Sequence, residues 1–185
     1  MTVPPQASEY RLRPATAVDV PEIVRVTNRA YRVEQFCLRG DRTDETDVSA
    51  RMRQGRFLVI EAPEAPSVLC ASVFMSMAAG RGFLGTLAVA PDCQGRGLAR
   101  ALVEAVEDQC RRADCAFLDL SVVNLRTELF PFYAKLGFTP SGILPFPKPE
   151  KVLLPLHLVQ LSKPLRAAVG STCRRARPSS VPGGW

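Results

Sequence analysis

The spacing of apolar residues in the first third of the chain predicts one short strand followed by two helices. Residues 10–15 alternate between arginines and less polar side chains, as expected for a strand with one buried face. From about residue 20 to 31 apolar residues recur at helical spacing, and either Thr16 or Asp19 begins a capping box for this helix. Residues 43–52 carry a weaker helical pattern and predict a second, shorter helix.

Three apolar segments rich in β-branched residues then predict an antiparallel meander. They cover residues 56–61, 67–77 and 83–89. The first two are separated by residues 62–66, which contain two prolines and therefore cannot continue a strand ladder. We expect a hairpin with its turn there and a second turn at 80–82.

In the second half of the chain the period of the apolar pattern changes to 3.6 residues. Residues 98–110 carry one apolar stripe and predict a long helix. A strand at 116–123, a shorter helix at about 127–136 and two strands at 138–143 and 152–161 complete the pattern. This order predicts an α/β domain in which helices cover a mixed sheet.

The two ends of the chain lack this periodicity. We interpret residues 1–9 as a flexible arm, residues 10–163 as one folded domain and residues 164–185 as a disordered basic tail rich in proline, glycine and arginine. Four arginines and no acidic residue lie in the tail, so they account for most of the net charge of +6. The domain itself therefore has no basic surplus of the kind that nucleic-acid binding requires, and we expect no nucleic-acid partner.

Nothing in the sequence indicates a membrane or metal protein. Residues 1–14 contain no apolar stretch of the kind expected in a signal peptide, and the longest nearly apolar run, residues 68–79, is too short to span a bilayer. The six cysteines form no C-x-x-C pair and His157 is the single histidine, so a metal site is not expected. We predict a cytoplasmic protein with no membrane partner and with reduced, mostly buried thiols.

The candidate chemistry begins where a strand runs through a glycine turn into the long helix. Gly95 and Gly97 let the backbone turn tightly and approach a ligand. The free N–H groups at the helix start favour a phosphate or pyrophosphate, and Arg96 and Arg100 add positive charge. A dinucleotide fingerprint would need glycine or alanine where Arg100 stands, and the Gly-Lys-Ser/Thr end of a P-loop is missing.

Three motifs in order resemble those of the GNAT superfamily of N-acetyltransferases. Gln94, Gly97 and Ala99 match the family's Arg/Gln-x-x-Gly-x-Gly/Ala turn after a strand that ends Leu-Ala-Val-Ala-Pro. Residues 124–138, Asn-Leu-Arg-Thr-Glu-Leu-Phe-Pro-Phe-Tyr-Ala-Lys-Leu-Gly-Phe, are similar to its Asn…Tyr-x-Lys-x-Gly-Phe element. The opening Tyr-Arg-Leu-Arg-Pro-Ala-Thr also resembles a GNAT first strand, so the resemblance covers about residues 10–163.

The resemblance implies a GNAT fold, with a mostly antiparallel mixed sheet, flanking helices and a splayed parallel strand pair. It implies acetyl-CoA as the acyl donor, with the pantetheine arm paired to the backbone at Leu87 and Val89. Asn124 would hydrogen-bond this arm, although it precedes Tyr133 by nine residues where a common family spacing is seven. The pyrophosphate would lie on the turn formed by Gln94, Gly95, Arg96, Gly97, Leu98 and Ala99.

The same resemblance makes Tyr133 the general acid. A phenol with a pKa of about 10 is protonated at neutral pH and can donate its proton to the departing CoA thiolate. The general base stays open among Glu34, Asp119, Glu128 and His157, and Arg42 and Arg126 are candidates to contact an acidic acceptor.

We therefore expect an enzyme that moves an acetyl group from acetyl-CoA to an unidentified amine by direct attack in a ternary complex. We expect it to act as a monomer or homodimer. One alternative is a non-catalytic acyl-CoA-binding module with the same fold. Another is an enzyme that binds a nucleotide phosphate on the same glycine turn.

Overall fold

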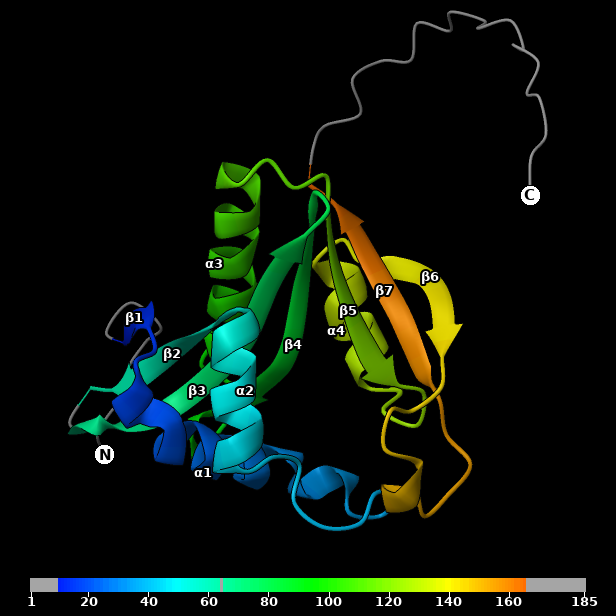
Figure 1. Cartoon of the computed structure of the whole chain (residues 1–185), viewed down its shortest axis with the longest axis horizontal. Coiled ribbons are helices and arrows are strands. Elements are labelled where there is room, and N and C mark those ends of the chain that lie inside the picture. The colour runs from blue at the N-terminus through cyan, green and yellow to red at the C-terminus, as the bar shows by residue number, and fades with distance from the viewer. Residues whose placement is uncertain (1–9, 64, 166–185) are drawn as a thin grey trace, which may run out of the picture.

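The computed structural model describes residues 10–63 and 65–165, so the arm at 1–9 and all but the first two residues of the predicted tail at 164–185 lie outside the described residues. Those two residues belong to the fold, since Pro164 ends the last strand and Leu165 is buried. One seven-stranded sheet runs through the molecule in the order β1-β2-β3-β4-β5-β7-β6 (Figure 1). The strands are β1 Arg11–Pro14, β2 Arg56–Ala62, β3 Ala65–Ala78, β4 Arg81–Val89, β5 Phe117–Val123, β6 Thr139–Leu144 and β7 Leu158–Pro164. The α-helices are α1 Val20–Tyr31, α2 Glu45–Gln54, α3 Leu98–Arg112 and α4 Leu129–Lys135.

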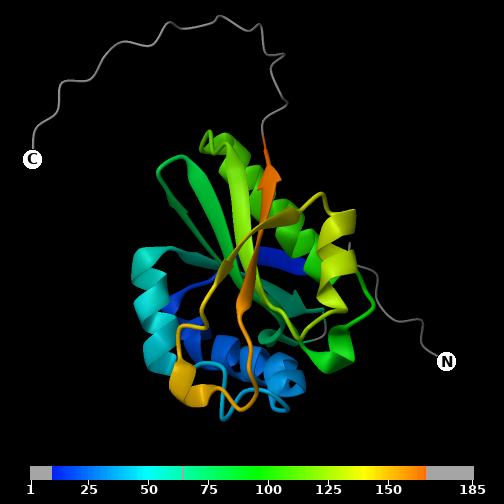
Figure 2. The same ribbon diagram turned by 90° about the vertical axis from the view of Figure 1, so that its right-hand side faces the viewer.

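The sheet is mixed, and all its neighbouring strands are antiparallel except β4 and β5. Figure 2 shows α2 on one side of the sheet and α3 and α4 on the other. This arrangement confirms the predicted α/β architecture with helices on both faces. Among the described residues, no helix is both long and apolar enough to cross a bilayer.

Both faces of β2 are buried because a helical layer covers each of them. Phe57 and Val59 point into a cluster with Ile23 of α1 and Val48 of α2. The alternate residues of the strand, Leu58 and Ile60, point into the larger cluster that includes Leu102 and Val106 of α3. A central strand that is covered on both sides reads as a continuous apolar run, and this explains its clear signal in the sequence.

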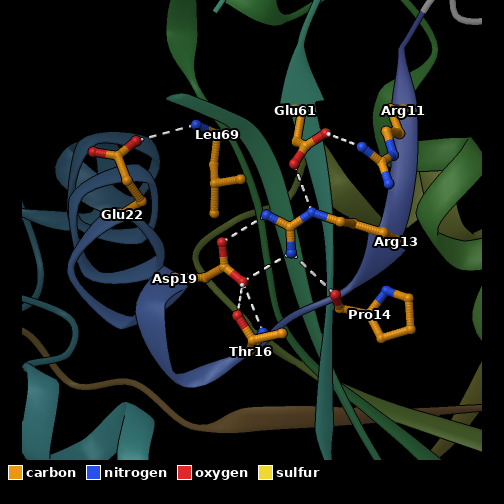
Figure 3. Close-up of polar contacts among 8 residues, drawn as sticks. All are labelled: Arg11, Arg13, Pro14, Thr16, Asp19, Glu22, Glu61 and Leu69. Carbon is orange, nitrogen blue, oxygen red and sulfur yellow. Dashed lines mark hydrogen bonds and ion pairs between the residues drawn. The ribbon is translucent and has the colours of Figure 1, made fainter. Parts of the chain in front are cut away.

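A cluster of hydrogen bonds and ion pairs joins β1 to β2 and to the start of α1 (Figure 3). The Arg13 guanidinium donates to Glu61 Oε1 at 2.6 Å and to both carboxylate oxygens of Asp19 at 2.7 and 2.8 Å. Asp19 Oδ2 also accepts from the Thr16 backbone N–H at 2.7 Å, so the capping interaction joins Thr16 with Asp19. The arginine face of β1 therefore makes the contacts, whereas Leu12, on the face expected to be buried, is 37% exposed.

The first hairpin is tighter than predicted, since β2 runs to Ala62 and β3 already begins at Ala65. The ladder shifts register on either side of Glu61, where Ile60 pairs with Ala71 but Ala62 pairs with Ala65. Pro66 falls within this irregular part of the ladder, as expected for a proline in a strand.

The prediction of a last strand at residues 152–161 was wrong at its start. The strand β7 begins only at Leu158, after Pro155 has removed one backbone donor. The preceding segment instead crosses to the chain after α1, where Leu153 N–H donates to Cys37 O at 2.9 Å and Arg39 N–H to Lys151 O at 2.8 Å. At its other end β7 continues to Pro164, and the buried Leu165 donates its N–H to Ala116 O.

Candidate active site

The site lies where β4 and β5 separate. The two parallel strands pair only over Arg81–Phe83 and Phe117–Asp119, and Figure 1 shows them diverging beyond this point. Because β5 stays paired to β7 along its whole length, the opening forms on the β4 side. Within the described residues no other strand takes this place, so backbone N–H and C=O groups at the edge of β4 are left for a ligand. The expected splayed parallel pair is confirmed.

A bulge in β4 accompanies the separation. The β3–β4 register shifts between Ser72 and Phe74, and Thr86 adopts a left-handed φ of 51° opposite this shift. A non-glycine residue in this region is strained, and such strain persists only where the surrounding structure holds it in place. The bulge bends β4 next to the residues that line the opening.

The opening contains a cavity of about 730 Å³. One wall is apolar and comes from the strands and α4. The other end carries ionisable groups from the end of α1 and the loop before α4. Its lining includes the apolar or aromatic residues Leu87, Val89, Val122, Val123, Leu129, Phe132, Tyr133 and Leu158, and the polar or ionisable residues Tyr31, Glu34, Arg42, Ser121, Arg126 and Glu128.

The glycine turn closes one part of this cavity and starts α3. Gly95 and Gly97 have φ values of 75° and 78°, which residues with a Cβ rarely adopt. No side chain caps α3, and its first N–H groups have no partner within the helix. An anion placed at the turn would satisfy these donors and would also interact favourably with the helix dipole.

Most of the residues expected at the turn line the cavity. Gln94, Gly95, Gly97, Leu98 and Ala99 do so, as do Leu87 and Val89 on the preceding strand.

The side chain of Arg96 is the exception. It donates to the Tyr10 hydroxyl and, at 2.9 Å, to Asp92 O, and it does not line the cavity. The exposed Arg100 lines the cavity instead and is the cationic side chain at this end.

Tyr133 on α4 is the phenol that lines the cavity beside Phe132. It is only 6% exposed, and edge-on contacts with Phe132 and Phe138 hold its ring, with centroids 5.1 and 5.8 Å away. Burial raises the pKa of Tyr133 well above its usual value, so its hydroxyl stays protonated at neutral pH. The helix ends at Lys135, and Gly137 just beyond it has a φ of 89°, which confirms the predicted left-handed cap.

Asn124 and His157 lie together but outside the cavity lining. Asn124 Oδ1 accepts from the His157 backbone N–H at 2.9 Å, and Asn124 N–H donates to His157 O at 3.0 Å. The asparagine carboxamide therefore ties the end of β5 to the entry of β7. This contact occupies Asn124 Oδ1, and the predicted hydrogen bond from Asn124 to the cofactor arm stays a prediction.

Two of the other proposed bases have strong arginine partners. Asp119 accepts from Arg81 at 2.6 and 2.7 Å near the closed end of the strand pair. Burial acts to raise the pKa of Asp119, but hydrogen bonds from Arg81 and Ser162 outweigh this and lower it. Glu128 lines the cavity but is exposed, and its hydrogen bond from Arg126 lowers its pKa.

Glu34, just after α1, is the buried carboxylate of the cavity. It is 5% exposed, and its Oε1 accepts from Arg126 Nη1 at 3.0 Å while Arg42 Nη1 lies 3.8 Å from Oε2. Burial raises the pKa of Glu34 by more than the two arginines lower it. Tyr31 also lines the cavity, with the Arg42 guanidinium 4.8 Å above its ring.

The sequence patterns did not single out Tyr31, because it occupies an ordinary position on the apolar stripe of α1. A second, smaller hollow of about 30 Å³ adjoins the cavity, and Tyr31, Glu34 and Arg42 line both. The described residues contain no group of three or more His, Cys, Asp or Glu arranged to hold a metal ion.

The sheet is split between two parallel strands, and a helix-starting glycine turn and a buried phenol line the split. The family model described as the Acetyltransferase (GNAT) family matches residues 26–138, which is more than half of the chain. The chain belongs to this family, and acetyl transfer from an acyl-CoA is the activity that membership supports. No curated protein sequence matches the chain.

Solved structures with the same fold share little sequence with this chain. The ribosomal-protein-S18-alanine N-acetyltransferase from Escherichia coli superimposes with a TM-score of 0.71 at 18% identity, over 89% of this chain and 99% of that one. Ard1 from Thermoplasma volcanium gives 0.70 at 15% identity, over 86% and 99%. Nourseothricin acetyltransferase gives 0.67 at 18% identity, over 85% and 99%. At these identities the likeness establishes the fold alone.

Proposed function

We propose that the protein is an N-acetyltransferase that transfers the acetyl group of acetyl-CoA to an amine by direct attack in a ternary complex. The observation that carries this proposal is the single cavity that joins the glycine turn, the free edge of β4 and Tyr133. A CoA thioester requires an anion site, an extended groove for the pantetheine arm and an acid near the sulfur.

The pyrophosphate would bind to the N–H groups between Gln94 and Ala99, with Arg100 as the nearby cation. The pantetheine amides would then pair with the backbone at Leu87 and Val89, as an added strand does. Tyr133 would protonate the departing thiolate, because a raised pKa keeps its proton available at neutral pH.

The environment of the cysteines near the cavity favours direct attack of the amine over an acyl-enzyme intermediate. Cys93 lines the cavity, but its Sγ lies 2.8 Å from Cys70 Sγ and both residues are buried. Burial raises the pKa of Cys70 to about 12, so the Cys70 thiol has little of the thiolate character that a nucleophile needs.

The first experiment is a calorimetric titration of acetyl-CoA, with ATP and NAD as controls. Heat specific to acetyl-CoA supports the cofactor assignment, and a folded protein that gives no heat refutes it. Binding of ATP or NAD without competition by CoA would favour the nucleotide-phosphate alternative.

The second experiment measures release of the CoA thiol with a panel of amines. The names of similar structures suggest two first choices, a peptide with an N-terminal alanine and nourseothricin. Free amino acids and polyamines extend the panel. Binding of acetyl-CoA without transfer to any of these amines would favour the non-catalytic acyl-CoA-binding module. The cytoplasmic location and the monomeric or homodimeric state stay predictions, and size-exclusion chromatography tests the latter.

A further inference from the structure

The carboxylate of Glu34 has an unusual place in the molecule. It follows α1 directly, and it is one of three residues that line both the large cavity and the smaller hollow beside it. The segment before β7 packs against the residues just after Glu34, because Leu153 N–H donates to Cys37 O. Glu34 therefore lies near the place where the chain after α1 meets the segment before β7, and these two regions come together only in the folded protein.

Its two oxygens have unequal surroundings. Oε1 accepts a hydrogen bond from Arg126, whereas Oε2 is buried and has no hydrogen-bond partner. The nearest cation to Oε2 is Arg42 Nη1 at 3.8 Å, which is longer than a hydrogen bond. A buried charged oxygen without a donor is costly, so this oxygen marks a place for a donor that the described residues do not supply.

We propose that Glu34 Oε2 binds the ammonium group of the acceptor and takes its proton, which makes Glu34 the general base of the transfer reaction. This inference rests on the proposed N-acetyltransferase function.

The charged and titratable groups around Glu34 fit this role. Arg42 faces it from the chain after α1, and Arg126 and Glu128 face it from the loop after β5. Tyr31 and Cys37 are the other titratable neighbours on its own part of the chain. Burial raises the pKa of Glu34 despite the two arginines, and a more basic carboxylate is a better proton acceptor near neutral pH.

Arg42 controls access to Oε2. Its side chain is 29% exposed and rests over the Tyr31 ring at 4.8 Å, with Phe146 on its other side at 5.9 Å. Because Arg42 makes no hydrogen bond to Oε2, an ammonium group can replace it there without breaking one. The aromatic ring of Tyr31 then faces the incoming cation, as it now faces Arg42.

The protons balance as follows. The acceptor ammonium loses one proton to Glu34 Oε2, which passes it to solvent, and the freed lone pair attacks the thioester carbon. The new N–C bond forms, the C–S bond breaks and Tyr133 gives its proton to the thiolate. The nitrogen loses its second proton as the amide forms, and this proton restores the Tyr133 hydroxyl. One amide, one CoA thiol and one net proton result.

The test compares Glu34→Gln with wild type, using the panel amine that gives the highest turnover. Glu107→Gln is the matched control, because Glu107 is another buried carboxylate held by two cations, Arg111 and Lys163, away from the cavity. Calorimetry with acetyl-CoA and the unfolding temperature are recorded for every variant. kcat/KM for the amine is measured from neutral pH up to the pKa of that amine.

We expect E34Q to lower kcat/KM at neutral pH by roughly 100-fold while the affinity for acetyl-CoA stays that of wild type. The difference in kcat/KM between E34Q and wild type should shrink as the pH approaches the pKa of the amine, because free amine is then present without the help of a base. A purely structural role would not produce this pH-dependent recovery. E107Q keeps the wild-type pH profile.

Wild-type kcat/KM in E34Q, or a deficit that is the same at every pH, overturns the role of Glu34 and leaves the transferase function standing. A wild-type protein that acetylates no amine defeats the proposed function, and the assignment of Glu34 falls with it. If E34Q does not bind acetyl-CoA, Glu34→Asp replaces it. The shorter side chain of E34D draws the carboxylate back from the amine, so its deficit in kcat/KM at neutral pH is expected to shrink as the pH approaches the pKa of the amine. Full activity in E34D, or a deficit that is the same at every pH, overturns the proposal.

Discussion

At the scale of single residues, Tyr133 derives its chemistry from its packing. Phe132 and Phe138 enclose its ring, and the resulting loss of water around the hydroxyl raises its pKa. Tyr133 also lines the cavity, so the proposed proton donor is a phenol that stays protonated at neutral pH. Glu34 shows the complementary effect, because burial makes its carboxylate more basic.

Tyr133→Phe removes only the hydroxyl and keeps the ring contacts. We expect turnover with acetyl-CoA and the best amine to fall roughly 100-fold, since the thiolate then leaves without an acid. Affinity for acetyl-CoA in calorimetry and the unfolding temperature should stay close to wild type. Because the pKa of Tyr133 is raised, wild-type activity should show no alkaline loss from this group at or below the ordinary tyrosine pKa of about 10. Full activity in Y133F would remove Tyr133 from the mechanism.

At the scale of elements, the site depends on how strands end and helices begin. The bulge at Thr86 bends β4 away from β5, and the turn that follows brings the open end of α3 to the cavity. The short β1 strand adds stability at the far edge, where Arg13 joins it to β2 and to the start of α1.

Gly97→Glu should abolish acetyl-CoA binding, because a carboxylate at the turn repels the pyrophosphate and fills its approach. The matched control is Gly80→Glu in the β3–β4 turn, where φ is 71° and no atom lies within 4 Å of an added Cβ. Both substitutions place a side chain at positive φ and share a strain of about 1–2 kcal/mol. In calorimetry the G97E affinity should fall by roughly 100-fold or more, about 3 kcal/mol, while G80E binds as wild type. Equal affinities would refute the position of the pyrophosphate.

Asp19→Asn should remove the ion pair that joins β1 to the start of α1, and the resulting loss of stability should depend on pH. The hydrogen bond from Arg13 lowers the pKa of Asp19 from 3.8 to about 2. A lowered pKa in the folded state stabilises the fold above the unfolded-state value, and this stabilisation is lost as the pH falls from about 4 to 2. Urea unfolding should show D19N less stable than wild type by about 2 kcal/mol at neutral pH, with the difference vanishing near pH 2.

Asp108→Asn is the control for this comparison. Asp108 is mostly exposed, and its contact with Arg111 is long at 3.5 Å, so the variant should differ little from wild type at any pH. A constant difference between D19N and wild type across the acid range would contradict the role of ionised Asp19.

At the scale of the whole molecule, β7 connects the last part of the chain to the sheet and to α3. This strand pairs with β5 on one side and β6 on the other, and its Lys163 reaches Glu107 of α3 at 2.5 Å. The last residues of β7 therefore join the sheet to the helix that carries the glycine turn. The folded domain extends to Leu165, two residues into the tail predicted from the sequence.

A chain that ends after Leu165 should keep the unfolding temperature and acetyl-CoA affinity of the full chain. A chain that ends after Leu161 loses three ladder pairs with Phe117–Asp119 and the cation of Lys163, so Glu107 is left with Arg111 alone. We expect this second truncation to cost roughly 3 kcal/mol in urea unfolding. A large loss of stability in the first truncation would show that the tail belongs to the folded domain.

Local sequence determined the order of the elements, the glycine turn and the left-handed cap at Gly137, because helical period, strand alternation and positive φ are set by neighbours in the chain. The sequence pattern predicted the start of β7 incorrectly, because the chain there crosses to the residues after α1 and does not pair in the sheet. It also assigned Arg96 and Arg100 equally to the anion site, since both lie in one turn. Only the fold directs Arg96 toward Tyr10 and leaves Arg100 at the cavity.

The tertiary structure alone decided which polar groups share the site. Asn124 and His157 carried no sign of their mutual contact, and Glu34, Arg42 and Arg126 gave no sign that they would converge. The contact between Glu34 and Arg126 spans 92 positions, and no local period encodes a pairing of that kind. The sequence by itself therefore predicted where an acyl-CoA would bind on this fold. The proposal of Glu34 as the base depends on burial and on the meeting of distant loops, which exist only once the chain is folded.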